Sequence, residues 1–108
     1  MKNPISRESL KKLIDANDAT ATLVEALPRQ YYDAEHLPGA INIDYQDIES
    51  KASALIPDKS STVVVYCASK DCNNSGIAAE TLEQLGYNDV RVYQEGKKDW
   101  KEAGLPLE

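Results

Sequence analysis

The chain has 108 residues, a formal net charge of −6 and an isoelectric point near 4.7. The length fits one domain over residues 1–108. The negative charge argues against nucleic acid and anionic membrane surfaces as partners. No apolar run approaches the length of a membrane span, and the N-terminal residues lack the pattern of a signal sequence. Two cysteines do not make a disulfide framework, so we expect a reducing cytoplasm as the compartment.

Helical and strand patterns alternate along the chain without an internal repeat. Ser6 is predicted to cap the first helix, because Ile5 and Leu10 have the spacing of a hydrophobic staple. Pro57 and Gly86 mark the expected ends of two later helices. The predicted elements, in chain order, are a helix after Ser6, strands at 21–24 and 40–43, a helix at 48–55, a strand at 62–66, a helix at 75–85, a strand at 90–93 and a short helix around Trp100.

This alternation predicts the fold class. Strands separated by helices are joined by crossover connections, which makes neighbouring strands parallel. We therefore expect an α/β protein of three layers, with a largely parallel central sheet and helices on both faces.

Cys67 is the most informative residue of the chain. It follows four β-branched residues, Thr62 to Val65, and Tyr66, a run that is typical of a strand covered on both faces. The next helix begins a few polar residues later, so Cys67 is expected at the carboxyl end of a central strand, facing the amino end of a helix. Open α/β sheets bind ligands at that position. Free amides and the helix dipole stabilise an anion there, and the reactive form of cysteine is the thiolate anion.

The polar loop after Cys67 is the predicted substrate-binding segment. Its amide groups are expected to surround the sulfur and to lower the pKa of the Cys67 thiol below that of a free cysteine, without a general base. Ser75 is expected to cap the following helix. The predicted substrate-binding residues are Ala68, Ser69, Lys70, Asp71, Cys72, Asn73, Asn74 and Ser75.

Three segments in the right order resemble the rhodanese family. Residues 35–43 (EHLPGAINI) are similar to its first signature, and residues 63–67 (VVVYC) to its strand and catalytic cysteine. Residues 95–100 (EGKKDW) with 104–106 (GLP) are similar to its terminal signature. The resemblance covers nearly all of the chain and implies a single rhodanese-like domain with sulfurtransferase activity and no cofactor. It implies that Cys67 takes a sulfane sulfur from a small-molecule or protein persulfide donor, holds it as a persulfide and passes it to a thiol or other nucleophilic acceptor.

Several departures from the family pattern leave the sulfur donor and acceptor open. The usual Asp-Val-Arg after the first strand is replaced by Glu25-Ala26-Leu27. The loop after Cys67 is about two residues longer than in the common single-domain form and has no arginine. Its one cation is Lys70, and Asp71 partly cancels that charge, so a thiosulfate dianion would meet only a modest positive field.

Two other chemistries fit the sequence poorly. A phosphatase of this fold closes its loop with an arginine that grips the oxyanion, and there is no arginine between Cys67 and Arg91. A structural zinc site needs four ligands, and two cysteines with one distant histidine do not supply them, so no metal is predicted.

Three hypotheses remain open besides an inert structural role for Cys67. The first is the sulfurtransferase. The second is a thiol redox or sulfide-sensing module in which Cys72 acts as a resolving thiol and attacks oxidised or persulfidated Cys67. The third is a non-catalytic rhodanese-like binding module. His36 and Trp100 are expected to have structural roles, and the cluster of Lys97, Lys98, Lys101 and Glu102 is expected to form a solvated helix face.

Overall fold

The computed structural model describes residues 3–16 and 20–108. Its elements, in chain order, are β1 (Asn3–Pro4), α1 (Arg7–Ala16), β2 (Ala21–Glu25), α2 (Arg29–Ala34), β3 (Ile41–Asn42), the 3-10 helix η1 (Tyr45–Asp47), α3 (Ile48–Leu55), β4 (Thr62–Tyr66), α4 (Asn74–Gln84), β5 (Asp89–Tyr93) and α5 (Gly96–Glu102).

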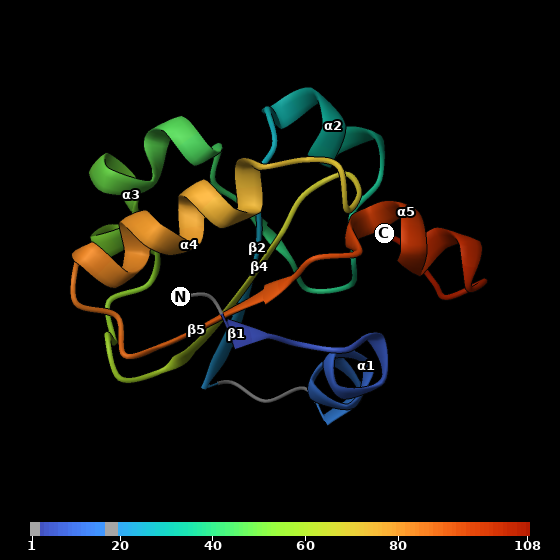
Figure 1. Cartoon of the computed structure of the whole chain (residues 1–108), viewed down its shortest axis with the longest axis horizontal. Helices are drawn as coiled ribbons and strands as arrows, with labels where there is room; N and C mark the ends of the chain where they lie inside the picture. The colour runs from blue at the N-terminus through green and yellow to red at the C-terminus, as the bar shows by residue number, and fades with distance from the viewer. Residues whose placement is uncertain (1–2, 17–19) are drawn as a thin grey trace.

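The five strands form one parallel sheet in the order β1-β5-β4-β2-β3, with β4 at its centre (Figure 1). Tyr66 at the end of β4 pairs with Glu25 at the end of β2 and with Tyr93 at the end of β5. The three strands thus end at the same edge of the sheet, where Cys67 follows β4. The predicted α/β class with a parallel central sheet is confirmed.

Helices cover both faces of the sheet. Val63 and Val65 of β4 belong to a core shared with α3 and α4, whereas Val64 and Tyr66 belong to a second core shared with α1 and α5. This separation follows from the alternation of side chains along a strand. Figure 1 shows α3 and α4 together on one side of the strands and α1 on the other.

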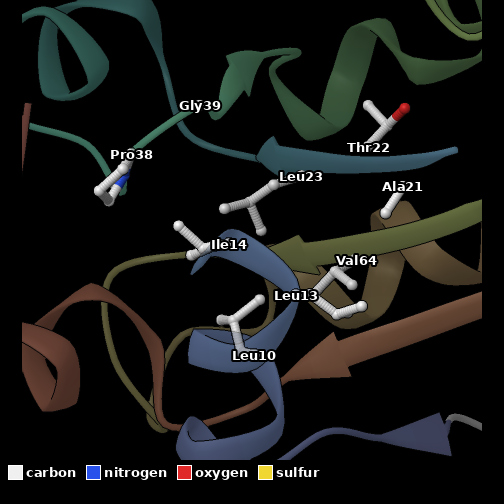
Figure 2. A pocket seen from close by; sticks show the side chains of 9 residues that line it. All are labelled: Leu10, Leu13, Ile14, Ala21, Thr22, Leu23, Pro38, Gly39 and Val64. Carbon is white, nitrogen blue, oxygen red and sulfur yellow. The ribbon is translucent and has the colours of Figure 1, made fainter. Parts of the chain in front are cut away.

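The first helix packs against the second core as its sequence predicts. The backbone amide of Ser9 donates to the hydroxyl of Ser6 at 3.1 Å, which confirms Ser6 as the N-cap. Figure 2 shows side chains of α1 over β2 and β4, around a small cavity of about 100 Å³. Leu10, Leu13 and Ile14 of the helix line this cavity together with Leu23 and Val64.

Some features of the fold differ from the prediction. β1, α2 and η1 were not predicted, and the strand expected at 40–43 is limited to Ile41–Asn42. The helix α2 buries no side chain and has no side-chain cap, so it leaves no hydrophobic periodicity to detect. Helix α4 begins at Asn74, and its N-cap residue is Asn73 without a side-chain bond. The prediction that Ser75 caps this helix is therefore wrong, because its hydroxyl turns toward Cys67 instead.

Candidate active site

Cys67 lies directly after the central strand and is 1% exposed. Its Sγ lies 3.4 Å from the carbonyl oxygen of Cys72 and 3.4 Å from the hydroxyl of Ser75. Ser75 is buried in the first turn of α4, so the sulfur faces the amino end of a helix of 11 residues. The predicted position of Cys67 is the one that the structure shows.

The environment of the sulfur shifts the pKa of the Cys67 thiol in the direction opposite to the predicted one. Burial, the largest cause, raises this pKa because a thiolate loses hydration, and a hydrogen bond with the side chain of Cys72 raises it further. Hydrogen bonds from the hydroxyl and the backbone amide of Ser75 oppose the rise, and the neighbouring Cys72 thiol adds to it. The resting site therefore holds a protonated sulfur, and the prediction of a lowered pKa is wrong.

The loop between Cys67 and α4 folds partly on itself. The Cys72 amide donates to the carbonyl of Ser69 at 3.0 Å, and the Asp71 amide donates to the hydroxyl of Ser69 at 3.4 Å. Within residues 3–16 and 20–108, the backbone N–H groups of four loop residues have no acceptor. These are Ala68, Ser69, Lys70 and Asn73. The amide that bonds the sulfur is that of Ser75, so the predicted ring of amides from residues 68–74 is not closed around Sγ here.

The start of α5 fixes the beginning of this loop. The amide of Lys97 donates to the carbonyl of Cys67 and the amide of Lys98 to the carbonyl of Ala68, both at 2.9 Å. Gly96 lies between helix and loop with a φ of +74°, and a Cβ there would approach the Ser69 nitrogen to 2.7 Å. Only glycine allows this close approach of two backbones. Backbone contacts from residues of the terminal signature thus keep the segment that carries Cys67 in place.

A buried polar network lies below the loop. Glu25 at the end of β2 is fully buried, and its Oε1 accepts a hydrogen bond of 2.7 Å from the hydroxyl of Tyr66. Nζ of Lys97 lies 3.1 Å from the same carboxylate. The hydroxyl of Tyr66 in turn accepts from the amide of Leu37 at 3.1 Å. Burial, as the largest cause, and the nearby charge of Glu25 raise the pKa of Tyr66, so this hydroxyl stays a donor.

Lys97 is the residue whose surroundings differ most from the prediction. It was expected on a solvated helix face, but it is 9% exposed, and its ammonium group donates to the carbonyls of Tyr31 at 3.0 Å and Glu35 at 2.6 Å. Together with Glu25 it joins β2, α2 and α5 beneath the loop. Lys98, Lys101 and Glu102 are exposed, as the prediction has them.

The remaining candidate residues have the expected structural surroundings. The His36 ring stacks on Tyr32 at 3.9 Å, and its Nδ1 lies 2.9 Å from the carbonyl of Tyr32. Trp100 is buried, packs edge-on against Tyr93 and donates to the carbonyl of Pro106 at 2.8 Å. Cys72 is half-buried, and both cysteines are free thiols.

Sequence reasoning missed Glu25, Gly96 and Lys97 as residues that build the site. One signal was present, since Glu25 interrupts an otherwise apolar stretch from Leu23 to Leu27, and a charge in a buried strand requires a partner. In the part of the chain that the structure describes, no group of three or more His, Cys, Asp and Glu side chains is arranged to hold a metal ion, and no helix is long and apolar enough to cross a membrane.

In this protein a buried cysteine follows the central strand of a parallel sheet and faces the first turn of a helix. These features define a class of cysteine-centred α/β proteins. Within this class the chain belongs to the rhodanese-like domain family, whose model matches residues 6–103.

Similar proteins agree with this membership. The chain is 31% identical over 104 residues to an HTH-type transcriptional regulator of Mycobacterium tuberculosis, covering 96% of this chain and 44% of that protein. It is 41% identical over 64 residues to thiosulfate sulfurtransferase PspE of Escherichia coli, covering 59% of each. The crystal structure of a thiosulfate sulfurtransferase from Pseudomonas aeruginosa matches with a TM-score of 0.87 at 28% identity, over 99% of this chain and 20% of that one. The chain therefore spans about half the length of the two curated relatives.

Proposed function

We propose that this protein is a sulfurtransferase that carries a sulfane sulfur as a persulfide on Cys67. The observation that carries the proposal is the position of the Cys67 sulfur, which lies at the end of the central strand and is hydrogen-bonded by the first turn of α4. A relative named as a thiosulfate sulfurtransferase and a relative named as a putative sulfur carrier protein of Bacillus subtilis support it.

The proposed reaction consists of two displacements at sulfur. In the first, the Cys67 thiolate attacks the sulfane sulfur of the donor, a new S–S bond forms at Sγ, and the donor's own bond to that sulfur breaks. The electron pair of the broken bond leaves with the rest of the donor, as sulfite if the donor is thiosulfate. In the second, an acceptor thiolate attacks the outer sulfur and regenerates the Cys67 thiolate. No external oxidant or reductant is needed.

The loop from Ala68 to Ser75 is the proposed substrate-binding segment. Four backbone N–H groups between Cys67 and α4 have no acceptor within the described residues, so they are available to an anionic donor or to the persulfide. The Ser75 hydroxyl and amide already bond the sulfur and oppose the rise of its pKa. Binding of a donor that displaces the Cys72 carbonyl from Sγ would remove a contact that favours the protonated thiol.

The partners of this reaction are a small-molecule or protein persulfide donor and a thiol acceptor. We place it in a reducing cytoplasm, because a free thiol is the required resting state and both cysteines of the chain are free.

Intact mass after incubation with a sulfane-sulfur donor tests the proposal. A gain of one sulfur by the wild-type protein, with none by Cys67→Ser, is the expected result. If neither protein gains mass with thiosulfate, a mercaptopyruvate donor or an organic persulfide, the sulfurtransferase proposal fails and the binding-module hypothesis takes its place.

A redox or sulfide-sensing module is the second candidate, because Cys72 is a free thiol in the same loop and its backbone contacts Sγ of Cys67. Attack of the Cys72 thiolate on Sγ of a Cys67 persulfide would break the persulfide S–S bond, release hydrosulfide and join the two cysteines, and the bridged protein would show a loss of two hydrogens relative to the unloaded protein in the same mass measurement. Cys72→Ser would abolish that species without preventing the gain of sulfur.

A further inference from the structure

A groove opens beside the reactive cysteine between α2 and α5, and Figure 1 shows both helices at the same end of the sheet. We call it the α2–α5 groove. Its volume is about 300 Å³, which lies at the lower end of the range for small-molecule sites, about 300 to 1,000 Å³. Its walls include Leu27, Tyr31, Ala34 and Ala68, together with Lys98 and Lys101.

The groove is adjacent to the reacting sulfur along the chain. Ala68, which forms part of its wall, is the residue after Cys67, and consecutive Cα atoms are about 3.8 Å apart. The Lys98 amide holds the carbonyl of Ala68 at 2.9 Å, so α5 keeps this wall in place. A molecule in the groove would therefore lie next to the segment that presents the nucleophile.

The walls favour an organic molecule over a small inorganic anion. Leu27 is buried and Ala34 and Ala68 are small and apolar, whereas Tyr31 is 51% exposed and its side chain has apolar surface that a ligand can cover. Burying such surface stabilises a ligand in proportion to its own apolar area, and thiosulfate has none.

The charges of the groove favour an anionic group on that molecule. Lys97 is paired with Glu25, and Lys101 is paired with Glu35 at 2.9 Å. Lys98 has no hydrogen bond or ion pair through its side chain among residues 3–16 and 20–108, so its ammonium group is available to a ligand.

A second recess beside the loop has the reverse character. Its volume is about 190 Å³, it shares Lys98 with the groove, and it is lined by Lys70 and by four carboxylates, those of Asp71, Glu95, Asp99 and Glu102. Its excess of negative charge repels an anionic donor. Of the two recesses, the α2–α5 groove is thus the one that an anion can use.

From this arrangement we propose that the α2–α5 groove binds the organic part of the sulfur donor, and that the donor is a low-molecular-weight organic persulfide bearing a carboxylate. This rests on the sulfurtransferase function proposed above and names the class of its donor. The carboxylate pairs with Lys98 and the carbon chain covers Tyr31 and Leu27. The Cys67 thiolate attacks the outer sulfur of R–S–SH, the donor's S–S bond breaks, and the organic thiolate RS⁻ leaves with the electron pair.

A matched pair of donors tests the proposal. The persulfide of 3-mercaptopropionate carries the carboxylate, and the persulfide of its primary amide has the same length without the charge. Initial rates of sulfur loading are measured for both, and for thiosulfate, on the wild type, Lys98→Ala and Tyr31→Ala. Lys12→Ala, a change of an exposed lysine on α1, is the control variant.

We expect the wild type to prefer the carboxylate persulfide over the amide by about fivefold, as for one partly solvated charge pair. Lys98→Ala should remove this preference and leave the rate with the amide unchanged. Tyr31→Ala should slow both organic persulfides by about tenfold and leave thiosulfate unchanged. Lys12→Ala should behave as the wild type.

Equal rates for the two persulfides on the wild type, or equal effects of Tyr31→Ala on organic persulfides and thiosulfate, would overturn the groove proposal and leave the sulfurtransferase function standing. Absence of loading by every donor would instead overturn the function on which the groove proposal rests. Both substituted side chains are exposed, so loss of the fold does not confuse these outcomes.

Discussion

The buried polar network of Glu25, Tyr66 and Lys97, here called the base of the site, and the loop above it differ in how their charges are stabilised. At the base, the Glu25 carboxylate is fully buried and is satisfied by Tyr66 and Lys97. In the loop, Lys70 and Asp71 are exposed and belong to a turn. A buried charge is costly unless it is paired, whereas an exposed one is screened by water. The base therefore fixes where Cys67 lies, whereas the charges of the loop are solvated.

The largest expected loss of stability comes from a change in the base of the site, Lys97→Met. The change leaves Glu25 buried without its cation and should lower the free energy of unfolding by about 3–5 kcal/mol, as for other broken buried pairs. Urea denaturation measures this loss. Lys101→Met removes the exposed partner of Glu35 and should cost less than about 1 kcal/mol. Equal costs for the two variants would contradict the contrast between base and surface.

The next largest loss of stability is expected from Gly96→Ala, at the contact between α5 and the loop. The residue has a φ of +74°, and the new Cβ would approach the Ser69 nitrogen to 2.7 Å. Gly104→Ala is the matched control, since Gly104 has a φ of +76° with nothing within 4 Å of the added Cβ. Gly104→Ala should cost about 1 kcal/mol for backbone strain alone. Gly96→Ala should cost more and also slow sulfur loading, and equal behaviour of the two would show that the close approach is unimportant.

A smaller effect concerns the pKa of the Cys67 thiol, which should differ from that of an ordinary cysteine. Because burial raises the pKa of Cys67, its alkylation rate should rise with pH through an inflection above about 8.5, the value of an unperturbed cysteine. The measurement uses Cys72→Ser, so that one thiol reports. The same shift stabilises the fold fully below the unfolded thiol's pKa, and this contribution is lost as pH rises through the folded pKa. An inflection below about 8.5 would show instead that loop amides surround the resting sulfur.

The smallest effects are expected in the loop. Lys70→Ala and Asp71→Asn change exposed side chains and should each alter the free energy of unfolding by less than about 0.5 kcal/mol. Their effects on loading by thiosulfate should have opposite signs, since the first removes a positive charge and the second a negative one. Stopped-flow loading rates at low salt measure both changes. Losses of stability as large as that of Lys97→Met would show that the loop is part of the rigid base.

The sequence predicts the parts of this molecule that depend on local patterns. The β-branched run at 62–66 and the helix that stops at Gly86 were found because their periodicity and end signals lie within a few residues. Lys97 was misassigned because its partner Glu25 is 72 residues away, and no local pattern reports that distance. The direction of the pKa shift of Cys67 was mispredicted for a related reason, since its largest cause is burial of the sulfur, which depends on how segments distant in the sequence pack around the end of the strand.

The loop residues from Ala68 to Ser75 and the role of Cys72 remain predictions about function. We expect Cys72 to influence how long the Cys67 persulfide survives and not to be needed for its formation. Loading requires one nucleophilic sulfur, whereas resolution requires a second thiol within reach.

The most direct test of the account is to locate the transferred sulfur. Cys67→Ser, Cys72→Ser and the wild type are incubated with the same donor, the excess donor is removed, and intact mass and peptide masses are followed over time. The account predicts one added sulfur on the peptide that contains Cys67 in the wild type and in Cys72→Ser, and none in Cys67→Ser. Sulfur loading of Cys67→Ser at the wild-type rate, or failure of Cys72→Ser to load, would contradict the assignment of Cys67 as the sulfur-carrying nucleophile.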